Sequence, residues 1–126
     1  MSNLPAKDRD YLESKGIDYE EHAENTQEAV IIKNCSLPDG RFDVQQADVL
    51  ILLPPGYPDV PPDMFFLLPW VKLLNGGRYP SRADVAFSFK NQSWQRWSRH
   101  NNEWRPGADG IWTMLKRVKF ALEKAV

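Results

Sequence analysis

The sequence has few of the cysteine and histidine side chains on which metal centres and thiol enzymes depend. Its 126 residues include one cysteine, Cys35, and two histidines, His22 and His100. A single cysteine excludes an intramolecular disulfide and suits a reducing cytoplasm. Because these three side chains follow no spacing typical of a zinc site, we expect no metal and no cofactor.

The chain also lacks an excess of charge, a long apolar run and an apolar leader. Its net charge of −1 argues against a protein that mainly coats nucleic acid or an anionic membrane. No apolar run approaches the roughly 20 residues that span a bilayer, and residues 1–10 have no apolar core of a secretory signal. We therefore expect a cytoplasmic protein with no membrane partner, folded as one domain over residues 1–126.

The most informative segment is the proline-rich stretch from Leu53 to Pro62. It holds five prolines and one glycine and lies between two apolar runs, Val49–Leu53 and Met64–Leu68. Proline fixes φ and has no backbone N–H, so this stretch is neither a central strand nor a helix interior. We predict a stiff, extended loop in which the ring of Tyr57 covers the strand end and its hydroxyl bonds to the backbone.

The remaining pattern predicts an α+β fold. We expect an N-terminal helix, a four-stranded antiparallel meander and an amphipathic C-terminal helix, in the ranges Leu4–Lys15, Ile17–Ala23, Glu28–Cys35, Arg41–Leu53, Asp63–Leu68 and Gly107–Val126. Asn3 and Asp109 are expected to cap the two helices. The range Arg78–Arg105 has no clear period and is predicted to be a long irregular segment of the kind that often binds partners.

A basic, aromatic cluster occupies the end of that irregular segment. Trp and Arg are enriched at the centres of protein interfaces, so we predict a partner-binding surface there. The tryptophans could equally belong to the core, and single-stranded nucleic acid would also suit aromatic rings among arginines, although no other feature supports it. The predicted partner-binding residues are Trp94, Arg96, Trp97, Arg99, His100 and Arg105.

Four strings of the sequence carry a family resemblance. They are D-R-D-Y-L, L-P-P-G-Y-P-D-V-P-P-D-M-F, W-Q-R-W-S-R-H and W-R-P-G-A-D, at Asp8–Leu12, Leu53–Phe65, Trp94–His100 and Trp104–Asp109. With them the chain resembles prokaryotic family E of the ubiquitin-conjugating-enzyme-like (UBC-like, RWD-like) proteins. The resemblance implies a minimal UBC-like fold whose structural motif is Tyr57, Pro58, Pro61 and Pro62 (the YP…PP) with Trp104 and Pro106 (the W-x-P).

The resemblance also implies partners, with one departure in chemistry. Relatives are encoded with a ubiquitin-like protein, often with several such domains in tandem, an adenylating activating enzyme and a JAB-type metalloprotease. Conjugating enzymes carry their acceptor cysteine before the W-x-P, after an H-P-N, whereas Pro69–Glu103 here contains neither. Because the thiolate accepts the ubiquitin-like C-terminus, thioester transfer at the usual position is excluded.

The sequence is compatible with three functions and favours the first. In the first, the protein binds the ubiquitin-like protein or its activating enzyme without catalysis. In the second, His100, positioned by a carboxylate, handles the acyl group of the ubiquitin-like C-terminus, and in the third the protein is a scaffold for tandem ubiquitin-like domains. His100 could instead bond a backbone carbonyl or Asp109 to fix its loop. Cys35 precedes the proline loop, and we expect it to be a buried, inert thiol.

Overall fold

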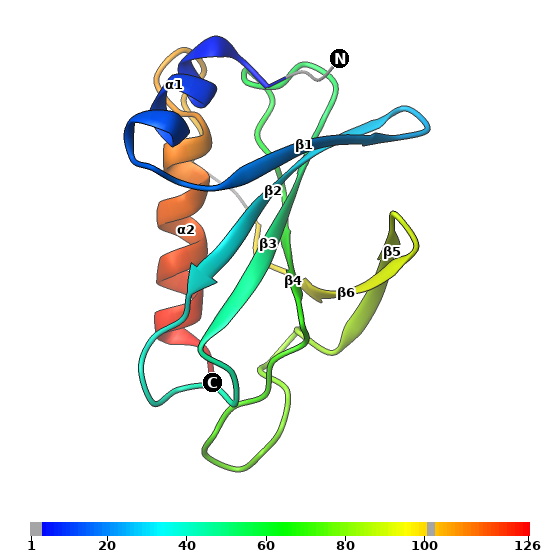
Figure 1. The fold of residues 1–126 in the computed structure, drawn as a ribbon, viewed down its shortest axis with the longest axis vertical. Coiled ribbons are helices and arrows are strands. Elements are labelled where there is room, and N and C mark those ends of the chain that lie inside the picture. The colour runs from blue at the N-terminus through cyan, green and yellow to red at the C-terminus, as the bar shows by residue number, and fades with distance from the viewer. Residues whose placement is uncertain (1–3, 101–102) are drawn as a thin grey trace.

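A computed structural model describes residues 4–100 and 103–126. Asn3, which we expected to cap the first helix, lies outside the described residues, and the helix begins after Pro5. Over the described ranges the chain forms two helices and one antiparallel sheet of six strands in the order β1-β2-β3-β4-β6-β5 (Figure 1). Their bounds are α1 Ala6–Ser14, β1 Tyr19–Glu24, β2 Gln27–Ser36, β3 Gln46–Leu53, β4 Phe65–Leu68, β5 Val85–Phe89, β6 Gln92–Trp97 and α2 Ile111–Lys124.

The predicted four-stranded meander is only part of this sheet. Strands β1 to β4 are neighbours in chain order, as predicted, but the segment predicted to be irregular contains the hairpin β5–β6, and β6 pairs with β4. The hairpin turns at Lys90 and Asn91, whose φ angles are 52° and 63°. Two successive positive φ angles are the geometry of a type I′ turn, which Asn-Gly or Asp-Gly usually signals. Lys-Asn gives no such signal, so the sequence pattern missed the hairpin.

Both helices lie on one face of the sheet and close the larger core over it (Figure 1). The predicted stripe of α2 is confirmed there, because Ile111, Val118 and Leu122 are buried and Leu115 packs partly against the core. In the described part of the chain, no helix is long and apolar enough to cross a membrane.

The opposite face has no helix to cover it and closes by curvature. Its buried residues form a second apolar cluster of Ala29, Ile31, Leu50, Phe66, Phe89 and Trp94. The sheet curls until the β5–β6 hairpin tip approaches the β1–β2 hairpin (Figure 1). There the Lys90 backbone N–H donates to Glu24 at 2.8 Å and Lys90 Nζ donates to the Ala23 carbonyl at 3.3 Å. The strands thereby bury their own apolar side chains.

A buried glutamine holds the connection between β4 and β5 against the sheet. Gln95 is 0% exposed, and its amide accepts from the Val71 backbone N–H and donates to the Val71 and Ala83 carbonyls, at 2.7–3.0 Å. A buried amide is tolerated only when it is bonded in this way. Gln95 thus fixes the segment that leads into the β5–β6 hairpin.

Candidate functional site

The proline loop and the W-x-P segment contact each other directly. The indole of Trp104 donates to the Pro58 carbonyl at 2.8 Å, and the rings of Tyr57 and Trp104 lie 6.3 Å apart. Tyr57 is 6% exposed, and its hydroxyl donates to the carboxylate of Asp8 at 2.5 Å. The ring is buried in the larger core. The backbone partner that we expected for its hydroxyl was wrong, because a carboxylate from α1 takes that place.

Asp8 also fixes the beginning of α2. Its side chain is 1% exposed and accepts from the Ile111 backbone N–H, one of the donors that a helix start leaves without an internal partner. Burial raises the pKa of Asp8, and the bonds from Tyr57 and Ile111 oppose that rise. One buried carboxylate therefore joins α1, the proline loop and α2.

Asp109, which we expected to cap α2, braces the turn before it instead. The helix N-cap is Gly110. Asp109 accepts from the Arg105 backbone N–H at 2.7 Å and from the Thr113 hydroxyl at 3.1 Å. The Arg105 backbone bond, aided by Thr113, holds the pKa of Asp109 below its usual range. The predicted N-cap of α2 was wrong by one residue, because Gly110, extended at φ −167°, takes that position.

A groove of about 650 Å³ lies beside α2 and the segment that follows β6. We call it the basic groove, because five of its lining side chains are Arg, Lys or His and one is a carboxylate. Its lining residues are Asp63, Phe65, Ser81, Arg99, His100, Thr113, Met114, Lys116, Arg117, Phe120, Ala121, Lys124, Ala125 and Val126. A smaller pocket adjoins it, lined by Glu103, Trp104, Arg105 and Asp109, and it shares Thr113 and Arg117 with the groove.

His100 stands at this groove and pairs with Asp63. Its Nδ1 lies 2.9 Å from Asp63 Oδ1, and both side chains are more than half exposed. The carboxylate beside His100 is therefore Asp63 and not Asp109, which we had considered. Asp63 comes from the end of the proline segment, so the pair ties that segment to the chain after β6.

Arg99 is held at the groove without a carboxylate. Its guanidinium stacks over the Trp97 ring at 5.0 Å and donates to the Ser81 and Ser98 carbonyls, both at 3.1 Å. Desolvation, with the nearby charge of Arg82, lowers the pKa of Arg99. An incoming anion would stabilise a desolvated cation of this kind by electrostatic attraction.

The predicted aromatic cluster does not form one surface. Trp94 and Trp97 are 1% and 0% exposed and belong to the two different core clusters. Side chains alternate across a strand, so residues three apart on β6 must point to opposite faces. Both tryptophans are thus unavailable to a partner in this fold. Arg96 lies on β6 with Trp94, opposite Phe66, whereas Arg105 pairs with Asp109 at 3.5 Å beside the smaller pocket.

Several groove residues that the site prediction did not name come from α2. Thr113, Lys116, Arg117, Phe120 and Lys124 line the groove from the helix. Their spacing of three and four residues is that of one helix face, which the sequence carries as a second stripe beside the apolar one. Phe120 in that stripe is 61% exposed, and an exposed aromatic residue among cations was the available signal.

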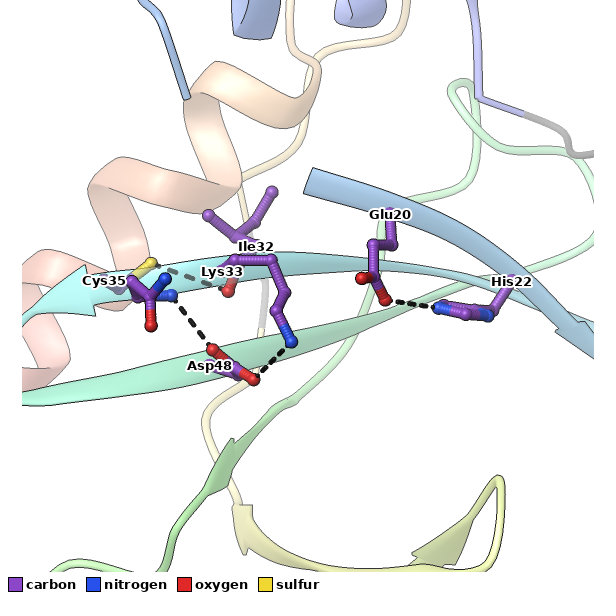
Figure 2. A network of polar contacts seen from close by, with 7 residues as sticks. Glu20, His22, Ile32, Lys33, Cys35 and Asp48 are labelled. Carbon is purple, nitrogen blue, oxygen red and sulfur yellow. Dashed lines mark hydrogen bonds and ion pairs between the residues drawn. The ribbon is translucent and has the colours of Figure 1, made fainter. Parts of the chain in front are cut away.

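Cys35 lies away from the basic groove, at the end of β2. Figure 2 shows its sulfur directed toward the Ile32 carbonyl at 4.0 Å, while Lys33 and the Asn34 backbone N–H both bond Asp48 at 2.9 Å. Cys35 is half-buried, and desolvation raises the pKa of its thiol to about 11. A raised pKa keeps the thiol protonated at neutral pH. The side chain is less buried than we expected, because it lines a second groove beside α2. Within the described ranges, no three His, Cys, Asp or Glu side chains gather as a metal centre requires.

Comparison with known proteins places this fold in a family. The sequence profile of prokaryotic E2 family E, E2 being a ubiquitin-conjugating enzyme, matches residues 4–125. The chain belongs to prokaryotic E2 family E. No curated protein and no solved structure matches it. In this family E protein, the interval Pro69–Glu103, which lacks cysteine, supplies Ser81, Arg99 and His100 to the basic groove.

Proposed function

We propose that this family E protein binds the C-terminal tail of a ubiquitin-like protein in the basic groove and forms no thioester. The observation that carries the proposal is the accumulation of cations beside exposed apolar surface, at the segment before the W-x-P. Arg99, Lys116, Arg117 and Lys124 line the groove together with Phe120. An E2-like relation supports a ubiquitin-like protein or its activating enzyme as the partner class.

The chemistry of such a tail fits these side chains. An extended tail ends in a carboxylate, and guanidinium groups bind carboxylates through two parallel hydrogen bonds. Phe120 offers an aromatic ring for an apolar side chain of the tail. The tail would thus be held by charge at one point and by apolar contact at another.

Titration of the purified protein with the ubiquitin-like protein and the activating enzyme of its own genome tests this function. Isothermal calorimetry would measure affinity, and light scattering would distinguish a one-to-one complex from a scaffold that gathers several copies. We expect the double variant Lys116→Glu/Lys124→Glu to lose binding. Lys119→Glu is the matched control, because Lys119 is on α2 but lines a different groove. Unchanged affinity in the double variant, or no binding by the wild type, contradicts the proposal.

The pair of His100 and Asp63 favours a second candidate, which is acyl transfer. When Nδ1 carries a proton and donates it to Asp63, Nε2 holds the free lone pair. Nε2 would attack the carbonyl carbon of the acyl adenylate made by the activating enzyme, expel AMP and form an acyl-imidazole. An incoming amine would then take the acyl group and release its proton, returning His100 to the neutral imidazole.

Mass spectrometry after incubation with the activating enzyme, the ubiquitin-like protein and ATP decides between binding and acyl transfer. An adduct of one ubiquitin-like chain that is lost in His100→Ala but kept in Cys35→Ala establishes the catalytic candidate. Asp63→Asn should weaken the adduct, because the ring then loses its anionic partner. Co-elution of the partners without any adduct leaves the binding function alone.

A further inference from the structure

The Arg and Lys side chains of the basic groove form no ion pair within the described part of the chain. Every Asp and Glu of the chain lies in the described ranges. The one acidic side chain that lines the groove, Asp63, pairs with His100. Among the described residues, no carboxylate forms an ion pair with Arg99, Lys116, Arg117 or Lys124. Since the whole chain has a net charge of −1, this positive surface is local.

Arg117 has a specific unmet bonding requirement. Its Nε is buried and has no hydrogen-bond partner in the described part of the protein. Arg117 lines both the basic groove and the adjoining smaller pocket. A buried donor without an acceptor is costly to the folded protein, and a shift of the guanidinium toward a carboxylate bound in the groove would give this donor an acceptor.

The apolar part of the groove restricts the class of anion. Phe120 and Val126 are 61% and 67% exposed, and Met114 and Ala121 line the groove beside them. Single-stranded nucleic acid is bound through several exposed rings on which bases stack. Here Trp94 and Trp97 are buried, and Phe120 is the aromatic side chain that the groove exposes most. Apolar surface next to unpaired cations is complementary to a peptide that alternates acidic and apolar side chains.

We infer that the basic groove selects an acidic, apolar peptide segment, with one carboxylate bound by Arg117 and a second by Lys124, and with an apolar side chain on Phe120. The inference rests on the proposed function and deepens it, because it states the charge of the partner segment that docks. The partner's tail, or the residues just before its terminal carboxylate, must then carry Asp or Glu.

Fluorescence anisotropy with two labelled peptides tests the inference on the full chain. The first probe alternates Glu and Leu over nine residues with a free C-terminal carboxylate, and the second has Gln in place of every Glu. We expect the Glu peptide to bind roughly tenfold more tightly or better, since each charged hydrogen bond contributes about that factor. Arg117→Gln and Lys124→Gln should each remove most of that advantage, while Lys119→Gln on the other side of α2 should keep it.

Each other result overturns the inference. Equal affinity for the two peptides, no binding of either, or an unchanged preference in Arg117→Gln would do so. If Arg117→Gln misfolds, the preference for the Glu peptide is measured with Arg117→Lys instead. This variant keeps the positive charge but loses the planar pair of donors, so the preference should still decrease. Displacement of the Glu peptide by a thymidine oligonucleotide at lower concentration would assign the groove to nucleic acid.

The failure of this inference can be told apart from the failure of the proposed function. In one case the ubiquitin-like protein binds, Lys116→Glu/Lys124→Glu abolishes that binding, and the Glu and Gln peptides bind equally. This result contradicts only the preference of the groove for an acidic peptide. In the other case the Glu peptide binds through Arg117 and the ubiquitin-like protein does not bind, which contradicts the proposed partner and supports the preference for an acidic peptide.

Discussion

A single buried side chain, Asp8, joins three parts of this fold. Its carboxylate is almost fully buried, accepts from the Tyr57 hydroxyl at 2.5 Å and accepts from the Ile111 backbone N–H. Burying a charge is costly unless hydrogen bonds compensate. Asp8 is therefore a site where small chemical changes should have measurable effects on the free energy of unfolding.

Tyr57→Phe should destabilise the protein by about 1–3 kcal/mol, because the change leaves a buried carboxylate oxygen without a donor. Urea denaturation gives the free energy of unfolding. The matched control is Tyr19→Phe, which removes a hydroxyl bonded to Glu13 at an exposed position. We expect the control to change stability by less than about 0.5 kcal/mol. Equal effects of the two substitutions would contradict the role given to the Asp8–Tyr57 bond.

Asp8→Asn should change how stability depends on pH. Burial raises the pKa of Asp8 in the folded protein above its ordinary 3.8. The folded state then holds the proton more tightly than the unfolded state, so wild-type stability falls as pH rises from below 3.8 through the folded pKa. The asparagine variant lacks this titration. The free energy of unfolding of the wild type minus that of the variant should therefore decrease between about pH 3 and pH 7.

The control for that experiment is Asp10→Asn, an exposed position on the same helix. Asp10→Asn makes the same chemical change at an exposed carboxylate, so a steeper decrease for Asp8→Asn than for Asp10→Asn identifies burial as the cause. A difference for Asp8→Asn that is flat or rises with pH would show that the hydrogen bonds to the carboxylate outweigh its burial.

At the scale of elements, the start of α2 determines how the W-x-P segment and the basic groove are held. The first helical N–H is satisfied by Asp8 from α1, about 100 residues away in the chain. The turn before the helix is braced by Asp109 through Arg105 and Thr113. Gly110 lies between these two anchors and gives the helix start room to approach α1.

Gly110→Ala should destabilise the protein by about 1–3 kcal/mol through overpacking. A Cβ at this position would lie 2.9 Å from Asp8 Oδ1 and 2.7 Å from the Trp112 ring. Thermal denaturation would measure the loss. A double-mutant cycle with Asp8→Ala supplies the control, since removal of the carboxylate should reduce the cost of the added methyl group. Strictly additive effects would mean that Trp112 alone, and not Asp8, resists the side chain.

At the scale of the whole molecule, the curvature of the sheet encloses the second apolar cluster in place of another layer of helices or strands. One face of the sheet is covered by the helices, and the other is closed by the approach of the β5–β6 hairpin to the β1–β2 hairpin (Figure 1). Lys90 and Glu24 make the closing contact. Strand β6 leads directly into Arg99 and His100, so the stability of this closure bears on the basic groove.

Glu24→Ala should loosen the closure without unfolding the protein. Loss of one acceptor for the Lys90 N–H is worth about 1 kcal/mol, or roughly a fivefold change in local opening. Hydrogen–deuterium exchange should therefore quicken across β5 and β6 by about that factor and stay unchanged in α1. Glu20→Ala, on the same strand, is the control because Glu20 pairs with His22 and, among the described residues, makes no hydrogen bond or ion pair with the β5–β6 hairpin. Equal exchange in the two variants would mean that the tip contact contributes nothing to closure.

The sequence by itself determined the parts that local pattern specifies. The apolar stripe of α2, the order of the first four strands and the place of the chain in family E were predicted, and the structure or the family comparison confirmed them. A loop at the prolines was also predicted, but residues 55–59 form successive turns and not the extended segment that we expected. Proline geometry, apolar runs and helical periodicity are each expressed within about ten to twenty neighbouring residues. They need no knowledge of what packs against them.

Only the tertiary structure decided the rest, because those features depend on contacts between distant residues. The β5–β6 hairpin forms at a turn without a glycine, and its pairing with β4 buries Trp94 and Trp97 on opposite faces. His100 meets Asp63 rather than Asp109, and the cations of α2 meet Arg99 only after the chain has folded. Spacing along the chain specifies a face of a strand or helix, but strand register and the packing of α2 decide which faces meet.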